Sequence, residues 1–282
     1  MALKREIIIG IALAIILIFA GIWYLNGRSA TVTRPAETAT STPSVTEGTA
    51  GPVPLSLNES GTYYDIRASY PSTTSLKGTA SASADANAVA AMKSWEQGAI
   101  AQFKTDGDFA HISANEAQMM DLSSDNKETL AITYTTASGA HTISYIYSVV
   151  SDTHGAHPNT TYKTFTFDTK TGTLLALSDL FPANADYLNT LSTAARKDLP
   201  AIIAAKEKVA VGDIGTDIFN SGTAPLADNY STWYISGSNL VLIFPPYQVA
   251  AYAAGEIELK LPLSSLGTAT TYTHVTDFGQ LY

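Results

Sequence analysis

The segment ETLAITYTTASGAHTISYIYSVVS, residues 128–151, sets the fold class of this chain. Two runs rich in threonine, tyrosine, isoleucine and valine, the residues that favour strands, lie on either side of Gly139 and Ala140. Two such runs around a short break that contains glycine are typical of a β-hairpin. We therefore predict two long antiparallel strands here.

The segment that follows, residues 151–181, carries two further turns and the densest group of candidate site residues. In HGAHPN, residues 154–159, Gly155 permits a tight turn between strands, and Pro158 marks a corner because it cannot donate to a central strand. His157 is then expected to make a local hydrogen bond. YKTFTFDTKTGTLLAL, residues 162–177, predicts two strands around a turn that ends at Gly172, and LSDLF then predicts a helical start with Ser178 as N-cap.

The rest of the chain adds helices and more strands. Apolar residues recur every three to four positions over residues 84–107 and predict a long helix. A second helical pattern covers residues 186–208, where Pro200 predicts either a break or the first turn of a new helix. Further strands are expected at residues 63–71, 231–236, 239–246 and 255–266. The fold class is therefore α+β, with antiparallel sheet and packed helices.

The N-terminal segment predicts a membrane anchor. Residues 7–25 carry no charge and are long enough to cross the hydrocarbon core, with Lys4 and Arg5 before them and Trp23 and Tyr24 at their end. This pattern favours a single transmembrane helix with its N-terminus inside the cell, and the alternative is a cleaved signal peptide. We expect no cytoplasmic domain before this helix.

Composition then divides the remainder. Residues 26–56 are rich in Thr, Ser, Ala, Pro and Gly, which predicts a flexible linker. We expect two α+β sub-domains, at residues 57–152 and 153–282, which share one core because neither half alone offers many apolar strands.

Charge and cysteine content exclude several classes of function. From Leu57 onward 12 Lys and Arg face 22 Asp and Glu, a balance of −10, so a nucleic-acid partner is excluded. This acidity would favour a basic partner, or it simply keeps the protein soluble. The chain has no cysteine, so a disulfide framework and a thiolate metal site are also excluded.

One enzymatic alternative stays open. His154, His157 and Asp168 could form the zinc site of a peptidoglycan-modifying hydrolase. However, Gly155 and Ala156 lie between the two histidines and provide no general base, and other catalytic motifs are missing from the sequence. We therefore expect no catalytic residue, no metal and no cofactor.

GAHPNTTYKTFTFDTKTGTLLALSDLF, residues 155–181, and WYISGSNLVLIFPPYQVAAYAAGEIELKLPLSSL, residues 233–266, carry a family resemblance. They resemble the extracytoplasmic domain pair of unknown function found in the lysozyme-sensing anti-sigma factor RsiV and the peptidoglycan deacetylase PdaC. The resemblance implies a non-catalytic binding module outside the cell, and in RsiV-like proteins the ligand is lysozyme. The sigma-binding segment and the deacetylase domain of these relatives are not expected here.

We therefore predict a membrane-anchored binding or sensor module of the bacterial envelope that recognises a lysozyme-like protein or cell-wall glycan. A structural envelope protein without a soluble ligand is a further alternative. PPYQVAAYAAG, residues 245–255, offers rigid prolines and tyrosines that suit an interface. The predicted binding residues are Pro246, Tyr247, Tyr252, His157 and Pro158, and the predicted structural turns use Gly155, Gly172 and Gly255.

Overall fold

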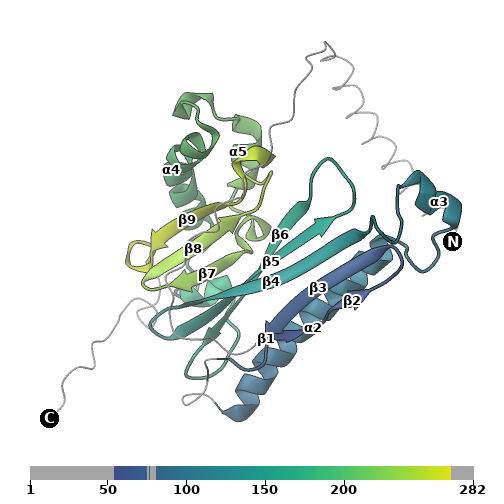
Figure 1. Cartoon of the computed structure of the whole chain (residues 1–282). Coiled ribbons are helices and arrows are strands. Elements are labelled where there is room, and N and C mark those ends of the chain that lie inside the picture. Colours follow the sequence, from purple (N-terminus) through teal and green to yellow (C-terminus); the bar gives the residue numbers. More distant parts are fainter. Residues whose placement is uncertain (1–53, 75, 77–80, 268–282) are drawn as a thin grey trace, which may run out of the picture. The chain divides into compact units, whose positions relative to one another are not determined.

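The computed structural model describes residues 54–74, 76 and 81–267 of the chain, which build two β-sheets with helices packed on them (Figure 1). The strands of the large sheet are β1 (Pro54–Ser56), β2 (Glu59–Ser60), β3 (Tyr64–Pro71), β4 (Glu128–Ser138), β5 (Thr142–Asp152) and β6 (Asn159–Asp168). The strands of the small sheet are β7 (Trp233–Ser236), β8 (Asn239–Phe244) and β9 (Ile257–Pro262). The α+β class and the antiparallel sheets are confirmed.

The large sheet has the order β1-β3-β4-β5-β6, with β2 also paired to β3. The predicted hairpin is confirmed, since β4 and β5 pair antiparallel from Thr129↔Asp152 to Ser138↔Ile143. One neighbouring pair differs from the all-antiparallel prediction, because β3 and β4 run parallel. Parallel neighbours need a long crossover, and the helix α2 (Ala82–Asp106) supplies it.

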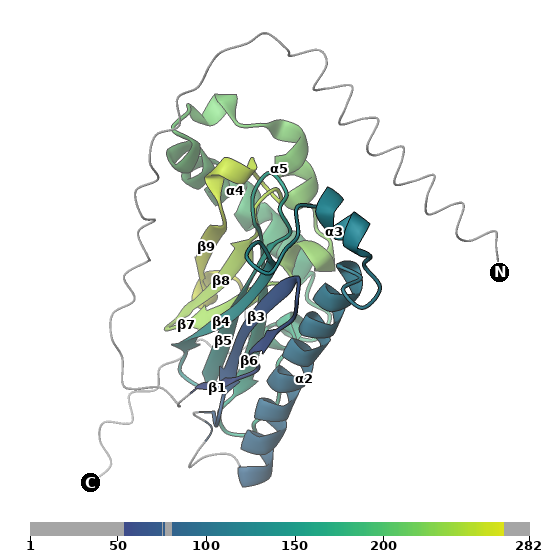
Figure 2. The same ribbon diagram turned by 45° about the vertical axis from the view of Figure 1, so that its right-hand side comes forward.

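The helix α2 covers one face of the large sheet (Figure 2). It begins at the predicted region because the side chain of Ser81 accepts a hydrogen bond from the backbone N–H of Ala84. Its inward face joins alternate side chains of the strands in a core with these members: Ile66, Ala68, Leu76, Ala88, Met92, Ile100, Phe103, Leu130, Ile132, Ile143, Tyr145, Tyr147, Phe165 and Phe167. A short helix, α3 (Ala114–Met119), lies between α2 and β4 in the sequence.

The small sheet is an antiparallel meander, and α4 (Tyr187–Glu207) packs beside β9 (Figure 1). The shorter elements around it are η1 (Leu177–Leu180), η2 (Val211–Asp213), α5 (Thr216–Gly222), η3 (Ala227–Tyr230), η4 (Tyr252–Ala254) and η5 (Leu263–Ser265). Its apolar residues, from Leu180 to Leu266, form a core separate from that of the large sheet. The expectation of one shared core is therefore wrong. β6 also lies beyond the predicted boundary at residue 152, yet it pairs with β5 along its length.

Backbone N–H groups on the edge of β7 join the two sheets. Trp233 donates to Thr164 Oγ1 and Ile235 donates to Ser144 Oγ, each at 3.2 Å, and Ser144 Oγ lies 2.9 Å from Thr166 Oγ1 in the buried interface. A neighbouring bond runs from the Gly237 N–H to the Ser138 carbonyl at 2.8 Å. Hydroxyl groups on the face of the large sheet therefore satisfy an edge strand that would otherwise be unpaired.

Close approach at this joint also requires a glycine in the β4–β5 turn. A Cβ atom at Gly139 would lie 2.6 Å from the Ile235 side chain and 2.6 Å from Thr142 Oγ1. The break that marks the hairpin in the sequence therefore also lets β7 approach the large sheet.

Several local predictions were wrong. α4 continues through Pro200, because its buried residues on both sides, Leu199 and Ile203 among them, pack on the small sheet and outweigh one lost hydrogen bond. The second strand predicted after Gly172 is reduced to a single bridge between Phe167 and Leu174.

Two predicted boundaries also differ from the structure. Ser178 lies inside η1, and the carboxylate of Asp179 accepts the Ala176 N–H in place of the predicted cap. The last residues of the predicted linker, Pro54–Ser56, form β1, and its other residues, 26–53, lie outside the described residues.

The predicted membrane anchor, residues 1–25, lies outside the described residues. Among the helices that the structure does describe, none is long and apolar enough to cross a membrane.

Replacing Ser144 by alanine removes the oxygen that receives the Ile235 N–H and leaves that donor buried. We expect Ser144→Ala to lower the free energy of unfolding by about 1–3 kcal/mol. Urea denaturation of the variant and of Thr161→Ala, an exposed position on β6, measures the difference. Equal stability of both variants would show that the hydroxyl does not support the joint.

The buried face of α2 carries a carboxylic acid, Glu96. Glu96 has no exposed surface, and both of its side-chain oxygens lack a hydrogen-bond partner among the described residues, as does the Tyr147 hydroxyl. Burial disfavours the charged form and raises the pKa of Glu96 to about 7. Glu96 therefore keeps its proton in the folded protein at pH values where the unfolded chain has lost it.

Stability should depend on pH through this group. Below the unfolded pKa of 4.5 both states hold the proton, so stability does not change with pH through Glu96 there, and the penalty from its ionisation grows as the pH rises towards about 7. We expect a loss of about 3 kcal/mol over this range that is absent in Glu96→Gln. Urea denaturation at a series of pH values compares the two proteins, and parallel profiles would contradict this assignment.

Candidate functional site

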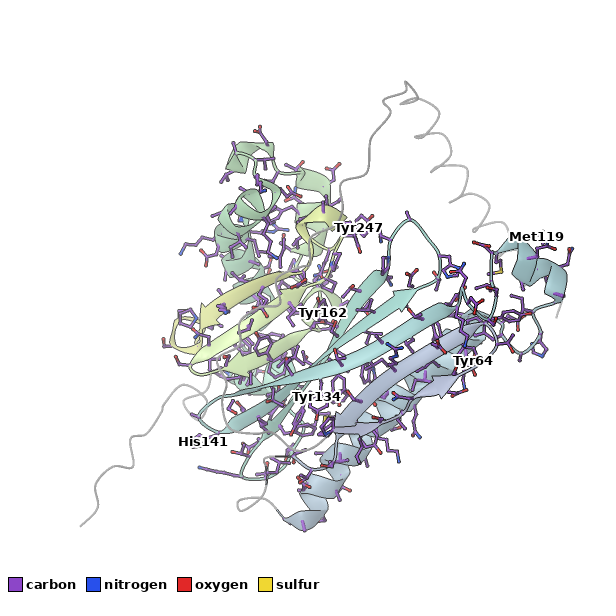
Figure 3. The ribbon with its side chains drawn as sticks, in the orientation of Figure 1. Tyr64, Met119, Tyr134, His141, Tyr162 and Tyr247 are labelled. Atoms are coloured by element: carbon purple, nitrogen blue, oxygen red, sulfur yellow. The ribbon has the colours of Figure 1, made fainter. Side chains whose placement is uncertain are left out.

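The predicted binding residues come together where the β5–β6 turn meets the connection after β8. The ring of His157 stacks on Tyr252 with centroids 3.5 Å apart and an interplanar angle of 15°. Its Nε2 atom lies 3.2 Å from the hydroxyl of Tyr247, which Figure 3 shows beside this end of the small sheet. Residues about 90 positions apart in the sequence thus form one group of aromatic rings, which we call the aromatic site.

The carbonyl of Pro158 fixes the orientation of both rings. It accepts a hydrogen bond from the Tyr252 hydroxyl at 2.8 Å, and His157 Nδ1 lies 3.1 Å from it. A carbonyl can only accept, so Nδ1 carries the proton in this bond. In neutral His157 the Nε2 atom then accepts from the Tyr247 hydroxyl. The local hydrogen bond of His157 is present, together with longer-range contacts that local sequence patterns did not predict.

The connection that holds Tyr247 is anchored by hydrogen bonds to α5 and η3. The side-chain amide of Gln248 donates to the carbonyls of Gly222 at 3.2 Å and Asn229 at 2.8 Å. Gly222 is required for this approach, since a Cβ atom there would lie 1.8 Å from the Gln248 carbonyl oxygen. Pro246 precedes Tyr247 in the same connection and limits its freedom.

Tyr247 has a strained backbone and an exposed ring. Its φ angle is 70°, in the left-handed region that tyrosine rarely adopts, and 57% of the residue is exposed. Such a conformation costs about 1–2 kcal/mol in an L-residue. An exposed aromatic residue held at this cost is typical of a functional surface.

The predicted turn glycines behave differently from one another. Gly172 and Gly255 have φ angles of 74° and 67°, which favour glycine. In the β5–β6 turn the left-handed position is His154, with φ 57°, and not Gly155. The prediction that Gly155 provides the turn through its conformational freedom is therefore wrong.

The zinc site considered as an alternative is not assembled. His157 precedes β6 and Asp168 ends it, so about 30 Å of extended strand separates them. The Asp168 carboxylate caps its own turn, where it accepts the N–H groups of Lys170 at 2.8 Å and Thr171 at 2.9 Å. Within residues 54–74, 76 and 81–267 no group of three His, Asp or Glu residues could hold a metal ion.

Carboxylates and phenols are also paired on the small sheet and on β6, and the sequence did not indicate them as a group. The Tyr234 hydroxyl donates to Glu258 at 2.8 Å. Burial, followed by the nearby charge of Glu256, raises the pKa of Tyr162 on β6. The Glu207 carboxylate accepts the N–H of Ala251, the residue before Tyr252, at 3.2 Å, so one negative charge lies beside this connection.

Residues 178–264 match the family described as "Protein of unknown function (DUF3298)". This part of the chain is therefore similar to a DUF3298 module. It contains the connection with Tyr247 and Tyr252, whereas His157 and Pro158 lie before it.

A curated relative supports the predicted resemblance to PdaC. Peptidoglycan-N-acetylmuramic acid deacetylase PdaC from Bacillus subtilis (strain 168) is 34% identical over 127 residues, which cover 44% of this chain and 25% of PdaC. The chain therefore spans about a quarter of the length of this relative.

Two solved structures match most of this chain. A DUF3298 family member from Bacteroides fragilis NCTC 9343 has a TM-score of 0.50 at 16% identity, over 77% of this chain and 93% of its own. A DUF3298 family protein from Pseudomonas aeruginosa PAO1 has a TM-score of 0.48 at 14% identity, over 77% and 92% of the two chains. At this identity the Bacteroides structure supports the fold alone.

The strain at Tyr247 can be measured with two substitutions. Tyr247→Ala keeps the left-handed cost, whereas Tyr247→Gly removes it. We expect the glycine variant to be more stable than the alanine variant by about 1 kcal/mol. Thermal denaturation of both proteins gives the difference, and a less stable glycine variant would show that the backbone there is unstrained.

Proposed function

We propose that this protein is a non-catalytic binding module of the bacterial envelope, and that its aromatic site recognises a lysozyme-like protein. The observation that carries the proposal is the exposed side chain of Tyr247, which is held on a strained backbone. Its hydroxyl contacts the His157 ring, which stacks on Tyr252. The resemblance to RsiV-like proteins supports lysozyme as the ligand.

The composition of the aromatic site suits recognition of a protein. Tyrosine gives a large contact area with few rotatable bonds, and rings that are already stacked lose little freedom on binding. The prolines beside the rings, Pro158 and Pro246, restrict the backbone before the partner arrives. The hydroxyl of Tyr247 is bound on one side only, so it can exchange its histidine contact for one with a ligand.

Electrostatics favour a basic partner. The chain from Leu57 onward has a balance of −10, and the Glu207 carboxylate lies beside the connection that carries Tyr252. Opposite charge speeds encounter and makes association sensitive to salt.

Cell-wall glycan is a second candidate, because the matching region also occurs in a protein named for its action on peptidoglycan. The stacked rings would offer flat apolar faces to a sugar, with the Glu207 carboxylate as a hydrogen-bond acceptor. This ligand is neutral or acidic, so salt should affect its binding much less.

The place of action follows from the N-terminal sequence. Residues 1–25 would tether the chain to the cell membrane as a single span, with its N-terminus inside. The module would then stand outside the membrane on the linker that follows. At that position it could meet a secreted lysozyme or the cell wall.

The proposal is tested by calorimetric titration of the full chain with a basic lysozyme, at low and at moderate salt. We expect binding that weakens with salt, and at least tenfold weaker binding by Tyr247→Ala, equal to about 1.4 kcal/mol or more. The matched control is Leu174→Ala, which truncates a 48% exposed apolar residue at the other end of β6. It should bind like the unchanged protein.

The same titration with soluble peptidoglycan fragments separates the two candidates. Binding of the fragments alone, with loss in Tyr247→Ala, would support the glycan. Binding of neither ligand would overturn the proposed function.

A further inference from the structure

A hollow lies on the other side of the β5–β6 turn from the aromatic site, between α3 and the start of β4. Its volume is about 520 Å³, and its lining residues are Met119, Met120, Asp121, Asn126, Glu128, Thr153 and His154. Figure 3 shows Met119 on α3, at the end of the large sheet away from the small sheet. Neither the proposed function nor the sequence comparisons assign a role to this hollow.

The floor of the hollow contains a buried carboxylate without a hydrogen-bond partner. Glu128 is 4% exposed, and its side chain makes no hydrogen bond to any residue that the structure describes. Burial raises the pKa of Glu128, and the nearby negative charge of Asp152 acts in the same direction, while His154 opposes it. A cation in the hollow would relieve this cost.

Two exposed methionines lie at the rim of the hollow. Met119 is 75% exposed and Met120 is 46% exposed, although methionine is normally buried. Methionine side chains are flexible and polarisable, and they adapt to the shape of a bound group. A second carboxylate, that of Asp121, lies at the rim and accepts a hydrogen bond from the Asn126 amide at 3.3 Å.

We propose that this hollow binds an arginine side chain of a partner protein, with Glu128 as the paired anion and the two methionines against the guanidinium and its stem. Arginine fits better than lysine because Glu128 is almost fully buried, and a guanidinium sheds water at lower cost than an ammonium group. Its planar fork can also reach a second carboxylate, that of Asp121.

This inference goes beyond the proposed function and does not depend on it. The hollow and the aromatic site use different residues, His154 and His157, of the same turn. A standard protein interface covers about 800 Å² on each partner, which is enough to reach both sides of that turn. The arginine site can nevertheless be tested with a small ligand alone.

The chain has four methionines, so a spectrum of the full chain labelled with ¹³C-methyl methionine is simple to interpret. Met119 and Met120 line the hollow, whereas Met92 is buried in the core and serves as an internal control. We would titrate with acetyl-Gly-Arg-Gly-amide, and with the matching citrulline and lysine peptides. Citrulline has nearly the shape of arginine without its charge.

We expect the arginine peptide to shift the Met119 and Met120 signals in a saturable way and to leave Met92 unchanged. The citrulline peptide should shift neither signal, and the lysine peptide should bind more weakly. In Glu128→Gln, which keeps the shape of the side chain, the affinity should fall at least about tenfold. The matched control Asp125→Asn removes one charge from an exposed residue that does not line the hollow, and it should bind as the unchanged protein does.

The inference fails if the methionine signals do not move, if citrulline or lysine binds as well as arginine, or if Glu128→Gln and Asp125→Asn behave alike. The proposed function is judged separately, by lysozyme titration of Tyr247→Ala. A folded Glu128→Gln is expected because the change removes a buried charge, and an unchanged Met92 signal would verify it.

Discussion

The hydrogen bonds between the edge of β7 and hydroxyl groups on the large sheet fix the position of the small sheet on the large sheet. An edge strand presents unpaired N–H groups, and burying them without partners would cost about 1–3 kcal/mol each. Thr164 and Ser144 accept two of them, so β7 can lie against the polar face of β5 and β6. The small sheet carries Tyr247 and the large sheet carries His157, and this joint helps to place the two within hydrogen-bond distance.

Much of the fold could be predicted because its signals are local. The β4–β5 hairpin and the apolar face of α2 depend on residues a few positions apart, and both were found. The parallel pairing of β3 with β4 depends on where a crossover helix packs, which no local pattern contains. The break predicted at Pro200 was wrong for the same reason. The packing of α4 on the small sheet outweighs the local tendency of proline to interrupt a helix.

The candidate site was predicted residue by residue, but its assembly was not. Tyrosines near prolines pointed to the connection after β8, and a histidine beside a proline pointed to the β5–β6 turn. That these segments meet follows only from the register of β6 and from the joint at β7. Glu128 gave no signal at all, because a strand that begins with a carboxylate is common and its burial arises from α3 and the β5–β6 turn above it.

The stack of His157 on Tyr252 is a second contact between the large sheet and the segments around the small sheet. It lies about one strand length from the first contact, the bonds made by β7. β6 has its turn with His157 at one end and Thr166, next to Ser144, near the other, about 30 Å apart along the strand. The small sheet is thus held to the large sheet at two separated contacts. It cannot rotate freely about either contact, and only rotation about the line that joins them is left. The two contacts together therefore restrict the relative motion of the two sheets more than either contact does alone.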